Sequence, residues 1–135
     1  MTIQFSVAVR NARANAVETT IGTSAILKLR TGAPPVDCAA ADSGTALATI
    51  NLPSDWAADA SGGAKAKAGT WQDTSADATG TIGHYRLYAS DGTTCHEQGT
   101  VTITGGGGDM TVDNTSVASG QQVTITAHTL TEGNA

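Results

Sequence analysis

The residues of this sequence that could do chemistry are few and widely spaced. Its histidines are His84, His96 and His128, and its cysteines are Cys38 and Cys95. A protein metal site needs several converging ligands, usually at short spacings such as C-x-x-C or H-x-x-x-H, and neither spacing occurs here. We therefore expect no metal ion or other cofactor, and we expect each histidine on the surface or on an edge strand. The cysteines should remain reduced thiols unless the fold brings them together.

Two loop-like segments resemble ligand-binding motifs only in part. Residues 73–80, DTSADATG, have the spaced acidic residues of a calcium loop but lack its closing glutamate and have no glycine at the expected position. Residues 105–108 are four consecutive glycines, which could form an anion-binding nest, yet no Lys-Ser/Thr pair and no helical pattern follow them. A turn rich in aspartate and a flexible hairpin connection are the simpler interpretations.

The sequence also lacks the patterns of common hydrolases. It has no G-x-S-x-G elbow, and its glutamates, Glu18, Glu97 and Glu132, fall on separate expected elements. We therefore predict that the chain is not an enzyme. Trp56 and Trp71 stand out because aromatic residues make up only 4% of the sequence. Their simplest role is to fill the core, and the alternative is that one is an interface anchor or a sugar-stacking platform.

Short alternations of apolar and polar residues between glycine-rich breaks predict a mainly β fold. The clearest stretch runs from residue 81 to residue 130 and contains TIGHYRLYA, TVTI and QQVTITAHTL. Further strands are expected at residues 25–30, 45–52, 69–71 and 109–113. Residues 1–135 should then form a single domain, a jelly-roll-like sandwich or small barrel of seven to eight short antiparallel strands, with a frayed tail at residues 132–135.

The Asp-Gly pair at residues 91–92 is typical of a β-hairpin turn. Counting outward from this turn places Tyr88 opposite Cys95 and Arg86 opposite Glu97. Arg86 and Glu97 would then form a cross-strand ion pair, which stabilises a sheet by about a few tenths of a kcal/mol when it is exposed.

Residues 5–21 have the periodicity of an amphipathic helix. Ser6 is placed to cap its start, and Gly22 lies where the helix should end. The apolar stripe consists of Phe5, Val9, Ala12, Ala16 and Ile21. Because much of this stripe is alanine, the helix can lie close against a sheet or against a neighbouring subunit.

The composition indicates an ordered domain with a thin core. Ile, Leu, Val and Phe number seven, six, eight and one, which is 22 of 135 residues. This share is below the roughly one-fifth at which disorder becomes a concern, but the net charge of −5 is too low for a disordered chain. A thin core gains little free energy from burial, so we expect the chain to gain stability by association.

The charged residues are unevenly distributed. Through Ala68 there are six basic and five acidic residues, a balance of +1, and from Gly69 onward there are one basic and seven acidic residues, a balance of −6. Proteins that grip nucleic acids need clustered lysine and arginine, so we expect no nucleic-acid partner. We also expect no membrane partner and no signal peptide, because no segment approaches the roughly 18 apolar residues of a span and the start lacks a basic region.

Beyond these patterns, the order of segments resembles a family of small head proteins of tailed bacteriophages. The segments are FSVAVRNARANAVETTIG, LKLRTGAPP, ADSGTALATINLP, W-x-DTSADATGT and GDMTVDNTSVASGQQVTITAHTLTEGNA. They span nearly the whole chain. Within this family, the chain looks most like the capsid cement, or decoration, proteins of short-tailed phages of the Bordetella phage type.

The resemblance implies a jelly-roll-like domain that forms a homodimer, binds the major capsid protein on the exterior of an HK97-type shell and bridges capsomers. The protein would be made in the host cytoplasm and would end in the virion. We expect contacts on the elements least able to fold alone: the N-terminal helix, the proline loop and the segment around Trp56. The selected residues are Phe5, Arg10, Arg13, Pro34, Pro35 and Trp56. Alternative functions that keep the fold are a tail or fibre component and a carbohydrate-binding β module.

Overall fold

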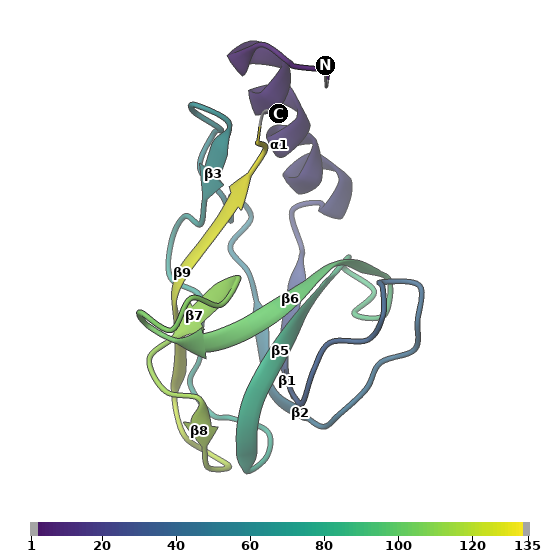
Figure 1. Cartoon of the computed structure of the whole chain (residues 1–135). Helices are drawn as coiled ribbons and strands as arrows, with labels where there is room; N and C mark the ends of the chain where they lie inside the picture. The colour runs from purple at the N-terminus through teal and green to yellow at the C-terminus, as the bar shows by residue number, and fades with distance from the viewer. Residues whose placement is uncertain (1–2, 134–135) are drawn as a thin grey trace.

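The computed structural model describes residues 3–133, which form one α-helix followed by nine β-strands (Figure 1). The helix is α1 (Val7–Ile21). The strands are β1 (Ile26–Thr31), β2 (Ala46–Asn51), β3 (Ala64–Ala66), β4 (Gln72–Asp73), β5 (Gly80–Tyr88), β6 (Cys95–Ile103), β7 (Met110–Val112), β8 (Ser116–Val117) and β9 (Val123–Thr131). Of the predicted frayed tail, residues 134–135 lie outside the described part. Glu132 is held in place, because its backbone N–H donates to the Gly63 carbonyl over 2.8 Å.

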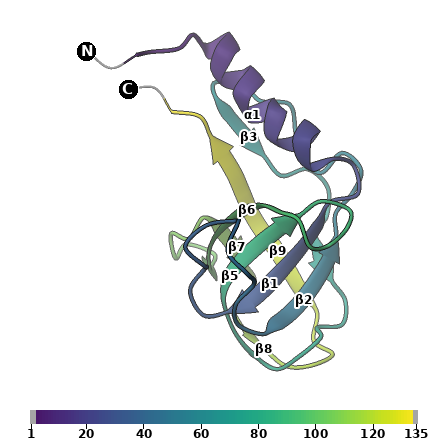
Figure 2. The same ribbon diagram turned by 90° about the vertical axis from the view of Figure 1, so that its right-hand side faces the viewer.

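One curled, mixed sheet forms the body of the protein, an open half-barrel (Figures 1 and 2). Its strands follow the order β2-β1-β5-β6-β7-β9-β3, with β4 paired to β9 and β8 paired to β5. The predicted mainly β fold with one N-terminal helix is confirmed, and the half-barrel is nearer to the predicted small barrel than to a sandwich. The prediction that every pair is antiparallel is wrong, because β6 and β7 run parallel.

The four glycines at residues 105–108 make this parallel pair possible. Parallel neighbours usually need a connection of about a dozen residues or more, but here Val101 already pairs with Met110. The chain doubles back so tightly that a Cβ on Gly106 would lie 2.7 Å from the Thr102 side chain. The predicted hairpin connection is therefore wrong: the segment is a compact return loop in which glycine fits the closest approach.

Two tryptophans form the centre of the core. The rings of Trp56 and Trp71 are fully buried and meet edge to face, with centroids 6.0 Å apart. Trp56 Nε1 donates to the Gly22 carbonyl, and Trp71 Nε1 donates to the Ala68 carbonyl, each over 3.0 Å. Aliphatic side chains of the sheet complete this cluster, among them Leu27, Leu29, Leu47, Ile50, Leu87 and Ile125. The predicted core role of both tryptophans is confirmed, and neither ring is available as a sugar-stacking platform.

The β5–β6 hairpin turns where the sequence predicts, and Tyr88 lies opposite Cys95 as expected. A bulge then shifts the register, so Arg86 lies opposite Gln98 and Leu87 lies opposite Glu97. The predicted Arg86–Glu97 ion pair is therefore wrong. Because side chains alternate along a strand, the extra residue in β6 turns Glu97 to the face opposite Arg86.

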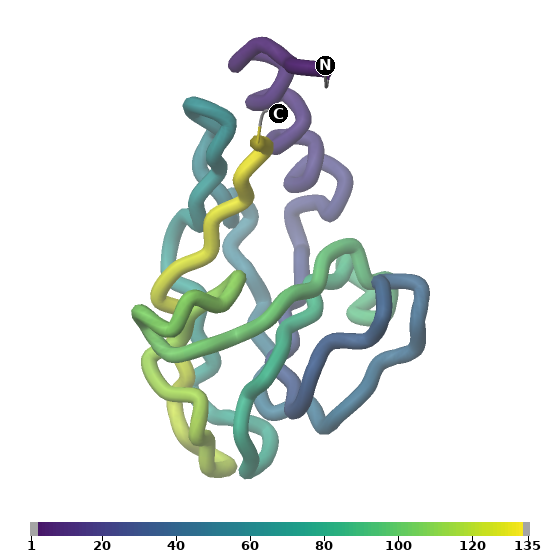
Figure 3. The backbone as a smooth tube through the Cα atoms, viewed as in Figure 1, coloured from purple at the N-terminus to yellow at the C-terminus, as the bar shows by residue number. Residues whose placement is uncertain are grey.

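The long loop of residues 32–45 covers the outer face of this hairpin (Figure 3). Asp42 Oδ1 accepts hydrogen bonds from Arg86 Nη1 at 2.7 Å and from the Tyr88 hydroxyl at 2.6 Å. Asp42 Oδ2 accepts from Arg30 Nη2 at 2.9 Å. Both arginines are buried, so the strand face that alternation predicts to be wet is covered by a polar layer. This covering role accounts for the unusual length of the loop.

Candidate functional site

Polar side chains attach α1 to the rest of the chain. Lys65 of β3 forms an ion pair with Glu18, with Nζ 2.7 Å from Oε2, and donates to Asn15 Oδ1 over 3.0 Å. Asn11 Oδ1 accepts the backbone N–H of Gly63 at 2.8 Å. Figure 2 shows the helix beside β3 and above the half-barrel. Because a buried ammonium group needs acceptors, the side of α1 that faces the body carries these polar groups beside the buried Ala14 and Ile21.

The apolar residues at the start of the chain remain largely exposed. This surface, the outer helix patch, consists of Ile3, Phe5, Val7, Val9, Ala12 and Ala16. Among its large side chains, Ile3 is 76% exposed and Val7 is 47% exposed. Of the predicted apolar stripe, only Ile21 is buried. Of the two predicted alternatives, the stripe packs on this chain's own core only at Ile21, and its packing on a neighbouring subunit stays a prediction.

Three of the predicted contact residues lie together near the end of β9. The Arg13 guanidinium stands 5.1 Å from the centroid of the Phe5 ring and forms an ion pair with Glu132, with Nη2 3.3 Å from Oε2. Arg10 Nη1 donates to the Glu132 carbonyl over 3.3 Å. Because Phe5 and Arg13 are both substantially exposed, this end of the molecule presents an aromatic ring and a cation to solvent.

The other predicted contact residues lie elsewhere. Pro34 and Pro35 are half-buried in the 32–45 loop, where the Pro35 carbonyl accepts a hydrogen bond from Gln98 Nε2 at 2.6 Å. Val36, which follows them, is 92% exposed. Trp56 must be removed from the predicted contact set, because its side chain has no exposed surface and completes the core.

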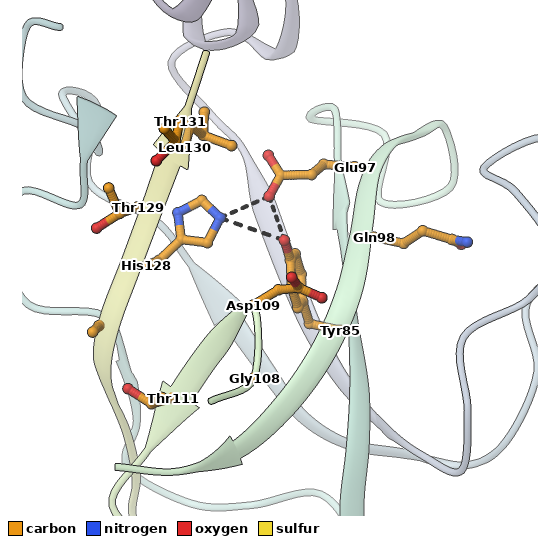
Figure 4. A pocket seen from close by; sticks show the side chains of 11 residues that line it. Tyr85, Glu97, Gln98, Gly108, Asp109, Thr111, His128, Thr129, Leu130 and Thr131 are labelled. Atoms are coloured by element: carbon orange, nitrogen blue, oxygen red, sulfur yellow. Dashed lines mark hydrogen bonds and ion pairs between the residues drawn. The ribbon is translucent and has the colours of Figure 1, made fainter. Parts of the chain in front are cut away.

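A second candidate site is a pocket of about 530 Å³ between β6 and β9 (Figure 4). Glu97 Oε1 accepts hydrogen bonds from the Tyr85 hydroxyl at 2.5 Å and from His128 Nε2 at 2.7 Å. Glu97 Oε2 is buried and has no hydrogen-bond partner among the described residues. The His128 ring also packs against Trp71, with centroids 5.4 Å apart. Three strands thus bring a carboxylate, a phenol and an imidazole together.

The pocket is built to accept hydrogen bonds. Burial and the neighbouring Glu97 carboxylate raise the pKa of Tyr85 far above its usual value, so the phenol stays neutral. At the rim, the backbone N–H and hydroxyl of Thr100 bind Asp109 and lower the pKa of its carboxyl. The carboxylates of Glu97 and Asp109 therefore favour a ligand with a cationic or hydrogen-bond-donating group. Neither serine nor cysteine is among the described residues that line the pocket.

The sequence does not predict this pocket. The predicted register places Glu97 on the opposite face of the hairpin, and the prediction of a surface or edge-strand position for His128 is wrong, because His128 is buried on β9 between β7 and β3. His84 is likewise buried, with Nδ1 2.9 Å from the Gly32 carbonyl oxygen, whereas His96 is exposed as predicted. The bulge that turns Glu97 toward His128 leaves no distinct signal in the sequence.

Within residues 3–133, no group of three or more His, Cys, Asp or Glu residues is arranged to hold a metal ion. The helix in this part of the chain is too short and too polar to cross a membrane. The structure is a small β half-barrel that carries an N-terminal helix on polar anchors. Comparison with protein-family models, curated proteins and solved structures gives no match.

Proposed function

We propose that this chain is a structural virion protein, a decoration protein that binds the exterior of an HK97-type phage shell and bridges neighbouring capsomers. The observation that carries the proposal is the orientation of α1, which packs on the body through polar anchors, Ala14 and Ile21 while the outer helix patch remains exposed. Contiguous apolar patches on soluble proteins usually mark protein interfaces. The resemblance of the sequence segments to phage decoration proteins supports the major capsid protein as the partner.

The outer helix patch has a continuation toward the hairpin, which supports an extended contact. A hollow of about 260 Å³ lies between α1 and β6 and is lined by Arg13, Ala16, Val17, Thr20, Ile21 and His96. The 32–45 loop beyond it displays Val36. Each copy would then bury a modest area against several coat subunits, and repetition over the shell would supply avidity.

Self-association forms the second part of this proposal. A homodimer would place two outer helix patches on the shell, so that the second contact forms at a high effective concentration. The thin core is a physical reason for such a partner, because association adds buried apolar area to a domain that has little of its own. The balance of −6 after residue 68 suits the exterior of a shell better than its DNA-filled interior.

A charge placed in the outer helix patch tests the proposal. The double variant Val9→Asp, Ala12→Asp changes two exposed positions, so the fold should be retained. Cells co-express each variant with an HK97-type major capsid protein, and cryo-electron microscopy of purified particles measures the bound copies. We expect at least a tenfold loss of affinity for the shell, which corresponds to about 1.4 kcal/mol, because carboxylates would be desolvated in the contact.

The matched control is Ile103→Asp, which makes the same apolar-to-acid change at a 52% exposed position at the end of β6. This control should bind shells like the unchanged chain, and circular dichroism should show that both variants fold. Full occupancy by the double variant would contradict the proposed contact. Density for the unchanged chain on the tail, with none on the shell, would instead favour a tail or fibre component.

A further inference from the structure

The only two cysteines of the sequence meet in the fold although 57 positions separate them. Cys38 lies in the 32–45 loop, and Cys95 is the first residue of β6. Their sulfur atoms are 2.8 Å apart, with the Cys95 thiol donating to Cys38 Sγ. Both residues are partly exposed thiols. A disulfide bond requires a separation of about 2.05 Å, so the sulfurs need to approach by less than about 1 Å.

The contact is fixed from both sides of Cys38. Before it, the carbonyls of Pro35 and Asp37 accept hydrogen bonds from Gln98 Nε2 at 2.6 Å and from Arg86 Nη2 at 2.8 Å. After it, the Asp42 carboxylate binds two arginines of the sheet. The loop is therefore pinned to β5 and β6 around the thiol pair, and the sulfurs meet as part of a defined packing arrangement.

We propose that Cys38 and Cys95 form an intramolecular disulfide when the folded chain meets a small-molecule disulfide such as oxidised glutathione. One protein thiolate attacks a glutathione sulfur, which forms a mixed disulfide and releases one glutathione thiolate. The second protein thiolate then attacks the protein sulfur of the mixed disulfide and releases the second glutathione. In total, two cysteine thiols are oxidised to one disulfide, and oxidised glutathione is reduced to two thiols.

The surroundings of the pair set the order of these steps. Burial, followed by the hydrogen bond and charge of Cys38, raises the pKa of Cys95 to about 12. Since the thiolate is the attacking species, Cys95 is a poor first nucleophile, and the exchange begins at Cys38. Cys95 then lies beside the mixed disulfide and resolves it.

The bond would fasten the 32–45 loop covalently to the first residue of β6. The exposed Val36 and the half-buried Pro34 and Pro35 of that loop would then lose conformational freedom. A cross-link between distant positions also restricts the unfolded chain, which favours the folded state. This inference stands on the thiol geometry alone and does not depend on the proposed function.

The test incubates the folded, reduced chain with oxidised glutathione and then blocks remaining thiols with a maleimide under native and denaturing conditions. We expect a monomer that has lost about 2 Da, carries no maleimide and melts at least about 5 °C higher than the reduced chain. Hydrogen exchange of the 32–45 loop should slow in the oxidised sample.

The single variants Cys38→Ser and Cys95→Ser serve as matched controls. Each should stay unlinked, and Cys38→Ser should acquire a glutathione adduct more slowly than Cys95→Ser. Persistent thiols in the treated wild-type chain, a stable glutathione adduct on it, or a disulfide between two chains would each overturn the proposal. An intramolecular disulfide that lowers the melting temperature would show that the bond does not fit the native packing, and this result too would overturn the proposal.

Discussion

Glu18 of α1 and Lys65 of β3 form an ion pair in which Glu18 Oε2 lies 2.7 Å from Lys65 Nζ. The Lys65 side chain is only 1% exposed, so its charge depends on Glu18, on Asn15 Oδ1 and on the Ala58 carbonyl. A carboxylate on the helix must therefore face β3. The face of α1 opposite to Glu18 then points into solvent, and this contact explains why Val9, Ala12 and Ala16 are exposed there.

Removing Glu18 should destabilise the fold much more than removing a surface ion pair. The substitution Glu18→Ala leaves the Lys65 ammonium buried without a countercharge, and we expect a loss of about 3 kcal/mol in the free energy of unfolding. Arg13→Ala, which breaks the exposed pair with Glu132, should cost less than about 1 kcal/mol. Urea denaturation followed by circular dichroism measures both, and equal losses would contradict a special role for Lys65.

The two tyrosines of the chain should resist ionisation as long as the chain is folded. Burial, the Glu97 charge and the hydrogen bond to Glu97 raise the pKa of Tyr85. Burial and the hydrogen bond to Asp42 raise the pKa of Tyr88 to about 12. Tyrosine in the unfolded chain releases its proton near pH 10. Above that pH the unfolded chain therefore binds fewer protons than the folded chain, and the stability of the folded chain should fall as the pH rises beyond about 10.

Ultraviolet absorbance of tyrosinate measures this prediction directly. The native chain should show little tyrosinate between about pH 10 and pH 11, whereas the chain in urea should titrate near pH 10. The variant Tyr88→Phe isolates Tyr85, which should ionise only as the chain unfolds. Reversible titration of both phenols near pH 10, with native circular dichroism retained, would show that neither is held by its carboxylate.

Local features of the sequence predicted much of the fold. Ser6 accepts the backbone N–H of Val9 and caps α1, and Gly22 ends the helix with φ of 95°. Alternating β-branched residues predicted most strands, and the Asp-Gly pair predicted the hairpin turn. These features depend on residues that are close in the sequence. They can therefore be recognised before any tertiary contact is known.

Long-range contacts determine the features that could not be predicted. The apolar stripe of α1 is visible in the sequence, but its orientation is set by Lys65, which lies 47 positions beyond Glu18 and on a strand that was not predicted. The pocket combines Tyr85, Glu97 and His128 from three strands, and a one-residue bulge decides which face Glu97 occupies. Periodicity alone specifies neither the partner of a face nor the position of such a bulge.

Asp42 should make the folded state sensitive to acid. Burial alone would raise its pKa, but the hydrogen bonds from Tyr88 and Arg86 and the charges of Arg30 and Arg86 outweigh this effect and lower it. As the pH falls, the unfolded chain therefore protonates Asp42 at a higher pH than the folded chain does, near the ordinary aspartate pKa of about 3.9. The stability of the folded chain should then decrease as the pH drops from there through the lowered pKa of Asp42.

The free energy of unfolding, measured from about pH 6 to pH 2, tests the role of Asp42. The variant Asp42→Asn should be less stable at neutral pH and should lose less further stability in acid than the wild-type chain. Asp59→Asn, which changes an exposed aspartate, should keep the wild-type acid dependence. An unchanged acid slope in Asp42→Asn would contradict this explanation.

The backbone contact between Gly83 and Gly32 should tolerate no side chain. A Cβ at Gly83 would lie 2.3 Å from the Gly32 carbonyl oxygen, the same oxygen that lies 2.9 Å from His84 Nδ1. Gly83→Ala must therefore push the start of the 32–45 loop away from β5, at a cost of about 2 kcal/mol or more. Gly133→Ala, with no atom within 4 Å of its Cβ, should change stability by less than about 0.5 kcal/mol. Urea denaturation measures both variants, and a neutral Gly83→Ala would show that the loop can lift from the sheet without loss.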